Sequence, residues 1–148
     1  MGMELKAVIG RLADLKEWKR TLPATAVCRF SGDLTLVPLT SRLLGEIWAW
    51  ARAGGAEEPR KDLAATQAWL AHASAGTFLV YADLFEFGDT GHEEYEIWEN
   101  GALVEPRRGA GGVIERFKKL GVDPGSDFDL EKYRGETAAE KWAAAESI

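Results

Sequence analysis

Two consecutive chain reversals near the middle of the sequence constrain the fold more than any other feature. The segment TFLVYADLFEF, Thr77 to Phe87, is rich in aromatic and β-branched residues, which favour an extended strand. The turn residues Gly88 to Gly91 follow it, and Asn100-Gly101 supplies the positive φ angles of a tight hairpin turn. The sequence therefore predicts an antiparallel meander, with strands over residues 77–87, 92–99 and 102–104.

The rest of the chain predicts strands and helices that do not alternate in the regular way of a parallel, doubly wound sheet. Further strands are expected over residues 5–9, 24–30 and 34–37, and helices over about 12–18, 40–53, 62–73, 113–120 and from 137 onward. With 148 residues, 46% of them hydrophobic, the chain has material for one core. We expect a single α+β domain over residues 1–148, in which an antiparallel sheet built on the meander carries helices packed on one face.

Helix ends and core positions follow from local patterns. Thr40 or Ser41 is a suitable N-cap for the helix that runs to Ala53. A later helix carries one apolar stripe and ends at Gly121, whose lack of a side chain suits the left-handed conformation beyond a helix end. Phe117 lies at the centre of that stripe, so we expect it in the core. The stripe consists of Val113, Ile114, Phe117 and Leu120.

Cysteine content and the N-terminus bear on the cellular compartment. Cys28 is the only cysteine, so the chain forms no internal disulfide and no cysteine-based zinc site. Its apolar strand context predicts a buried, inert thiol. The first ten residues lack the apolar run of a secretory signal. These features predict a cytoplasmic protein, and we expect no membrane span, no metal and no cofactor.

Three patterns resemble chemical sites, and each has a simpler structural explanation. Cys28 and His72 could form a nucleophile and base, but a cysteine in an apolar strand usually acts as a small hydrophobe. The loop Arg107 to Gly112 could bind an anion before a helix, although it lacks phosphate-loop spacing. Four acids near the C-terminus lack the order of a calcium loop, and a turn before a helix explains them. These acids are Asp123, Asp127, Asp129 and Glu131.

The negative charge is concentrated in one part of the chain. The net charge is −6, yet residues 62–106 contain nine acids and no lysine or arginine. That segment carries −9, and the rest of the chain carries +3 by difference. Such a segment repels nucleic-acid phosphates and attracts basic proteins. We therefore expect a protein partner with a basic surface and no nucleic acid.

Strand periodicity places several of these acids on one face of the meander. Residues 92, 94, 96 and 98 share a face, while Tyr95 and Ile97 occupy the opposite, core face. A three-residue loop, Asp89 to Gly91, would set Glu86 opposite Glu94, whereas a four-residue loop would set Asp83 opposite Glu96. Either register places two carboxylates in direct opposition, which is unfavourable without a compensating cation or proton.

These opposed acids have three readings. They are a solvated surface at a small energetic cost, a docking surface for a basic partner, or a carboxylate pair acting as general acid and base in an enzyme. A deep pocket over the acids would favour the enzyme, and a flat surface would favour docking. A small-ligand module using the aromatic strands is a further alternative. The residues predicted to contact a partner are Asp83, Glu86, Glu94, Glu96 and Trp98.

Several segments resemble a group of small bacterial proteins over about residues 33–134. The similar segments are Leu36-Val37-Pro38-Leu39-Thr40 before a helix, the hairpin Phe78 to Trp98 with its Asn100-Gly101 turn, Leu120-Gly121-Val122, and the acidic stretch Asp127 to Asp129. The group resembles immunity proteins of bacterial polymorphic-toxin systems. The resemblance implies an acidic protein that binds and blocks a toxin, and it assigns no catalytic residue.

Overall fold

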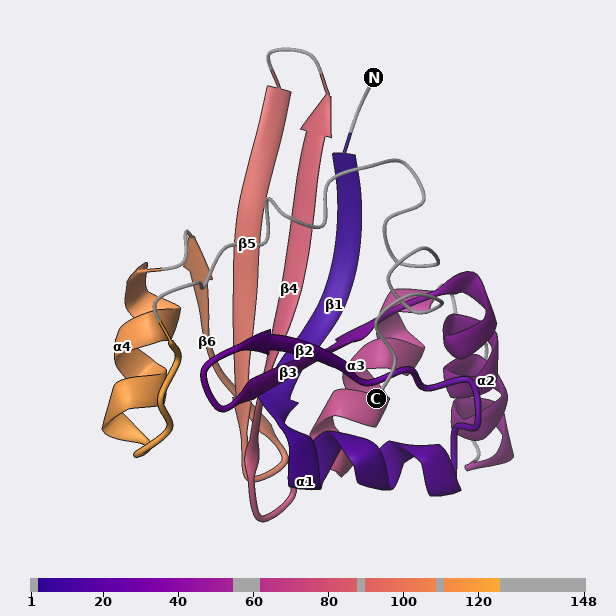
Figure 1. Cartoon of the computed structure of the whole chain (residues 1–148). Coiled ribbons are helices and arrows are strands. Elements are labelled where there is room, and N and C mark those ends of the chain that lie inside the picture. The colour runs from indigo at the N-terminus through magenta and orange to yellow at the C-terminus, as the bar shows by residue number, and fades with distance from the viewer. Residues whose placement is uncertain (1–2, 55–61, 88–89, 109–110, 126–148) are drawn as a thin grey trace.

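The computed structural model describes residues 3–54, 62–87, 90–108 and 111–125 (Figure 1). Six strands form one antiparallel sheet, which confirms the predicted α+β class. The strands are β1 (Met3–Arg11), β2 (Cys28–Ser31), β3 (Leu34–Pro38), β4 (Phe78–Phe87), β5 (Thr90–Glu99) and β6 (Ala102–Arg108). The helices are α1 (Leu12–Leu15), continued by the 3-10 helix η1 (Lys16–Arg20), α2 (Ser41–Ala53), α3 (Asp62–Ala73) and α4 (Gly111–Lys119).

The strand order is β2-β3-β1-β4-β5-β6, so the meander supplies one half of the sheet. The predicted Asn-Gly turn is confirmed, because Asn100 and Gly101 have φ angles of 52° and 84°. Its backbone is anchored to the end of α3. The Asn100 amide donates to the Thr77 carbonyl at 3.0 Å, and the Gly101 amide donates to Ser74 Oγ at 3.1 Å.

The register between β4 and β5 differs from both predicted registers. Phe87 pairs with Thr90, so the strands are joined by two residues and not by three or four. This register sets Ile97 opposite Val80 and Tyr95 opposite Ala82, and all four side chains are buried. The three-residue loop would have placed Ile97 opposite Asp83. Pairing of apolar residues on the buried face therefore excludes the three-residue loop. The four-residue loop would set Ile97 opposite Ala82, and the observed pairing of Phe87 with Thr90 rules it out.

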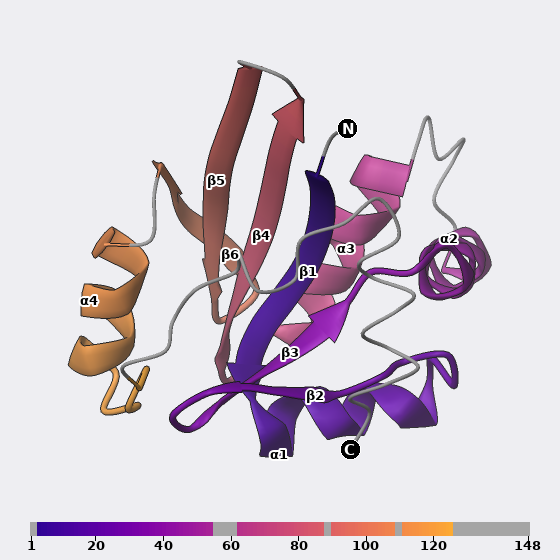
Figure 2. The same cartoon turned by 45° about the horizontal axis from the view of Figure 1, so that its top comes forward.

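Apolar side chains cover both faces of the sheet. On one face α4 packs against the meander, and Phe117 lies 5.6 Å from Phe78 between ring centres. On the other face α1, η1, α2 and α3 cover the strands; the strand residues of that core include Val8, Val37, Leu79, Tyr81 and Trp98. Figure 2 shows α4 on one side of the sheet and α2 and α3 on the other.

The predicted placement of helices on one face is therefore corrected. The cause lies in β4, where consecutive residues from Phe78 to Ala82 are all buried. A strand with apolar residues at every position exposes hydrophobic surface on both faces, so both faces need cover. A final helix predicted from Thr137, with Trp142, lies outside the described residues, as does the acidic stretch after Gly125.

The structure confirms the helix start at Thr40 and the helix end at Gly121 that the sequence predicts. Thr40 caps α2, because its side chain accepts a hydrogen bond from the Leu43 amide at 3.1 Å. After α4, Gly121 has a φ of 77°, and the Val122 amide donates to the Phe117 carbonyl at 3.0 Å. The expected strand over residues 24–30 is shorter, since β2 begins at Cys28. None of the described helices has the length and apolar character needed to cross a bilayer.

Cys28 lies in β2 and is 0% exposed, as predicted. We expect a thiol reagent added to the folded protein at neutral pH to label Cys28 much more slowly than the same reagent added in urea, because attack requires an accessible thiolate. Mass spectrometry of the labelled chain over time measures both rates. Similar rates in the folded and unfolded states would contradict the observed burial.

Candidate functional site

Two acids oppose each other directly across the β4–β5 hairpin. Asp83 pairs with Glu94, so their Cβ atoms are about 4.5–5.5 Å apart. Asp83 is half-buried and Glu94 is exposed. The sequence correctly predicted one carboxylate opposite another but named the wrong pairs. In the structure Glu86 faces Gly91, and Glu96 faces Tyr81.

Bases from outside the hairpin flank this acid pair. Lys6 of β1 lies opposite Asp83, and Arg108 of β6 occupies the position opposite Glu94. Four neighbouring strands therefore carry a base, two acids and a base in one row. Residues 62–106 contain no lysine or arginine, but the sheet places Lys6 of β1 opposite one of their acids. The sequence contained no signal for this, because the pairing of β1 with β4 joins residues that are far apart in the chain.

Glu96 and Trp98 lie on the same face as this row, nearer to the helices. Trp98 is 7% exposed and belongs to the core under the helices. Its Nε1 donates to Glu96 Oε1 at 3.2 Å. Trp98 was predicted to contact a partner; in the structure its ring packs inward, and its indole N–H donates to a half-buried carboxylate at the core boundary. The side chain of Glu86 lies outside the described residues.

The acids begin where the helices stop covering the sheet. Tyr81 of β4 is buried under the helices, and Asp83, the next residue on the same face, is half-buried. Figure 1 shows β4 and β5 extending past α2 and α3 at this end. We call Asp83, Glu94 and Glu96 the acidic surface. It is the part of the sheet face that the described helices leave accessible.

A further acid of the hairpin has a structural partner. Glu99, at the end of β5, forms an ion pair with Arg116 of α4, whose Nε donates to Glu99 Oε2 at 3.0 Å and whose Nη2 also reaches this oxygen. This contact ties α4 to the meander. Glu99 is therefore not part of the acidic surface.

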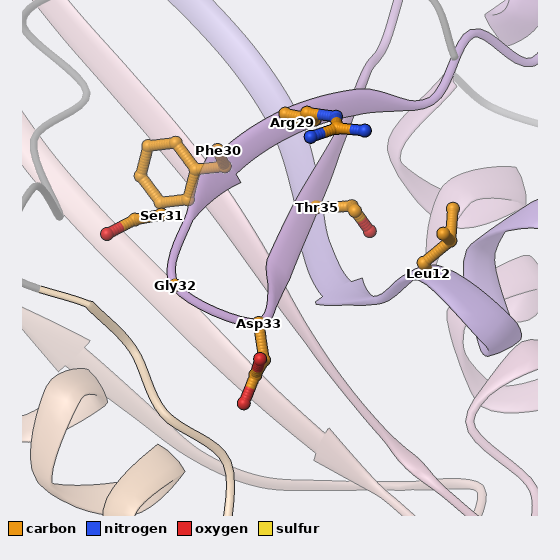
Figure 3. A pocket seen from close by; sticks show the side chains of 7 residues that line it. All are labelled: Leu12, Arg29, Phe30, Ser31, Gly32, Asp33 and Thr35. Atoms are coloured by element: carbon orange, nitrogen blue, oxygen red, sulfur yellow. The ribbon is translucent and has the colours of Figure 1, made fainter.

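An open hollow of about 400 Å³ lies between α1 and the β2–β3 hairpin (Figure 3). Figure 3 shows Arg29 and Thr35 on the side of Leu12, whereas Asp33 points away from them. Thr35 Oγ1 donates to the Gly10 carbonyl at 3.0 Å. The lining consists of Leu12, Arg29, Phe30, Ser31, Gly32, Asp33 and Thr35. This hollow contains no pair of carboxylates, and sequence reasoning did not single it out.

The remaining candidate groups have structural surroundings of their own. His72 packs against Trp50 and Trp69, with ring centres 5.2 and 5.4 Å away, whereas Cys28 is buried in β2. Asp123 accepts the Gly125 amide at 2.8 Å in a turn, and the other acids of the calcium pattern lie outside the described residues. Within the described ranges, no three His, Cys, Asp or Glu residues are grouped so that they could hold a metal ion.

Comparison with known proteins returned no matching family, no matching curated protein and no matching solved structure.

Proposed function

We propose that this chain is a non-enzymatic protein-binding domain that captures a basic partner through the acidic surface. The observation that carries the proposal is the direct opposition of Asp83 and Glu94 at the accessible end of the sheet. Like charges in directly opposite strand positions destabilise a sheet. A cation contributed by a partner would be attracted by both carboxylates at once.

The neighbouring lysine of β1 bears on what kind of partner fits. Because Lys6 lies opposite Asp83, the negative potential is weakened on the β1 side of the acidic surface. Exposed charges are screened over about 8–10 Å at physiological salt. A basic side chain of the partner must therefore come close to Asp83 and Glu94 in the bound complex, while longer-range attraction acts on the association rate at low salt. A lysine or arginine placed between Asp83 and Glu94 meets this requirement.

The finer form of the proposal is an immunity-type inhibitor that binds and blocks a basic toxin in the cytoplasm. Support comes from the net charge of −6, from the segment similarities described above, and from a single cysteine that is buried as a thiol. The toxin would be encoded next to the gene for this chain, so the product of the adjacent gene is the partner to test.

The test is the association rate of that gene product with wild type and with the double variant Glu94→Lys/Glu96→Lys. We expect association to slow by about tenfold at low salt, and the difference to shrink at high salt, because steering depends on unscreened charge. Stopped-flow mixing measures the rates. The melting temperature of the double variant should fall modestly, because a lysine at position 96 cannot accept the Trp98 indole N–H.

Two controls separate the local surface from net charge and from misfolding. The variant Glu17→Lys/Glu115→Lys makes the same change in net charge at exposed positions in η1 and α4. It should leave association nearly unchanged. The single variant Glu94→Lys keeps the hydrogen bond between Glu96 and Trp98 and should retain part of the effect. Equal rates for wild type and Glu94→Lys/Glu96→Lys at both salt concentrations would refute the proposal.

A further inference from the structure

Exposed apolar side chains gather on one outer strand. In the described part of the chain the large apolar residues that stand exposed are Leu12 (39%), Leu103 (43%) and Val104 (46%). Leu103 and Val104 are neighbours in β6, and β6 is the last strand in the sheet order. An outer strand with adjacent apolar residues presents both hydrophobic surface and backbone hydrogen-bonding groups. Proteins normally protect such an edge or use it for binding.

An irregularity in the pairing separates Val104 from the regular ladder. Ile97 of β5 pairs with Glu105, but Trp98 pairs with Leu103, so Val104 is an extra residue in β6. A bulge of this kind bends the strand and redirects side chains. It occurs where the two exposed apolar residues lie, which makes this short stretch distinct from the rest of the edge.

This stretch adjoins the acidic surface. Leu103 is directly opposite Trp98 and therefore shares its face of the sheet. Glu96 is two residues from Trp98 on that face and accepts its indole N–H at 3.2 Å. Trp98 therefore has an exposed leucine as its neighbour on the adjacent strand and a half-buried carboxylate two residues away on its own strand. The combination is complementary to a segment that carries both aliphatic and basic side chains.

Proline limits how far a docked strand could extend. Pro106 lies opposite Glu96 in β6 and has no backbone N–H to donate. A strand added to the outside of β6 can therefore pair along residues 102–105 but loses a donor at Pro106. This restricts docking to a short segment and protects the remaining edge from open-ended association.

We infer that β6 docks an extended segment of the protein partner, with aliphatic side chains against Leu103 and Val104 and a lysine or arginine against Glu96. The inference rests on the proposed function and adds the class of segment that is recognised. Main-chain pairing at a sheet edge supplies affinity that is independent of side chains, and alternate side chains supply specificity. Charge complementarity with Glu96 selects a basic segment over an acidic one.

The test uses three synthetic eight-residue peptides in which two valines are followed by two lysines, two serines by two lysines, or two valines by two glutamates, each pattern being repeated once. In an extended peptide of this kind each face carries both types of side chain, as Leu103 and Glu96 on one face of the sheet require. Titration of the full chain, followed by the NMR shifts of its backbone amides, measures affinity and location together. We expect the valine–lysine peptide to bind with its largest shifts at residues 102–105 and at the Trp98 indole. The other two peptides should bind at least about tenfold more weakly.

Matched variants test the apolar contact. Leu103→Ser should weaken the valine–lysine peptide by about tenfold, because truncating a central apolar contact removes a large share of binding energy. Leu12→Ser changes a leucine of similar exposure on α1 and should have no effect. Both positions are exposed, so both variants should keep the wild-type melting temperature.

Each other outcome would contradict a specific part of the inference. Equal binding of the valine–lysine and serine–lysine peptides would refute the apolar edge contact while leaving the acidic surface as a docking site. Equal binding of the valine–glutamate peptide would refute the role of charge and the proposed function with it. No binding of the valine–lysine peptide at millimolar concentration, or shifts confined to other strands, would also refute edge docking.

Discussion

Replacing Phe117 with alanine should lower the free energy of unfolding by about 3–5 kcal/mol. Phe117 is 1% exposed and stands at the centre of the core that α4 forms with the sheet. Its ring packs on Phe78 of β4. Removing the ring loses the transfer free energy of a buried aromatic side chain and leaves a cavity that rigid strands cannot close.

Urea denaturation followed by tryptophan fluorescence measures this loss. Since domains of this kind are stable by about 5–15 kcal/mol, the change should be a large fraction of the total. Lys118→Ala, at the next and exposed position of the same helix, is the control and should change stability by less than about 0.5 kcal/mol. A Phe117→Ala variant as stable as wild type would show that α4 contributes little to the core.

Replacing Gly32 with alanine should also be strongly destabilising, for a reason that lies in the backbone. Gly32 has a φ of 57° in the turn between β2 and β3, a conformation that costs a non-glycine residue about 1–3 kcal/mol. A Cβ at this position would lie 2.5 Å from the Asp123 carbonyl oxygen and 2.5 Å from the Gly125 nitrogen. Both atoms belong to backbone, which cannot move aside as a flexible side chain would.

The clash would break the junction that holds the segment after α4. At that junction the Asp33 amide donates to the Asp123 carbonyl at 2.9 Å, and Ser31 Oγ donates to the Pro124 carbonyl at 2.6 Å. The measurement is again urea denaturation. We expect a loss larger than the cost of the φ angle alone, because these hydrogen bonds are disrupted as well.

Gly45→Ala is the matched control for this prediction. Gly45 lies in α2, and a Cβ built there meets no atom within 4 Å. Alanine at this helical position should raise stability by about 0.5–1 kcal/mol. The same chemical change is therefore expected to have opposite signs at the two sites. Equal effects at Gly32 and Gly45 would contradict the close approach of the two backbone segments.

The candidate site shows where reasoning from sequence succeeded and where it stopped. Strand periodicity correctly put Glu94 and Glu96 on one face and Tyr95 on the other. It could not tell which residue of β4 each acid would face, because loop length alone left the register open. It also left open how deeply Trp98 is buried. Alternation identifies the residues that share a face, but it does not show how far a helix from elsewhere in the chain covers that face.

Local physical chemistry was enough to define the parts of this protein. Backbone preferences and side-chain caps act within a few residues, so the sequence by itself determined the Asn100-Gly101 turn, the Thr40 cap and the helix end at Gly121. An unbroken apolar stripe likewise placed Phe117 in the core, and an apolar strand context placed Cys28 there.

Only the tertiary structure determined how these parts combine. Burial of β4 on both faces put α4 opposite the other helices, and the pairing of Phe87 with Thr90 fixed the register of the hairpin. Pairing of β1 with the hairpin then placed Lys6 opposite Asp83. These outcomes depend on the joint burial of residues that are distant in sequence. The free energy of that burial is gained only when the segments pack together, so no single segment determines the outcome.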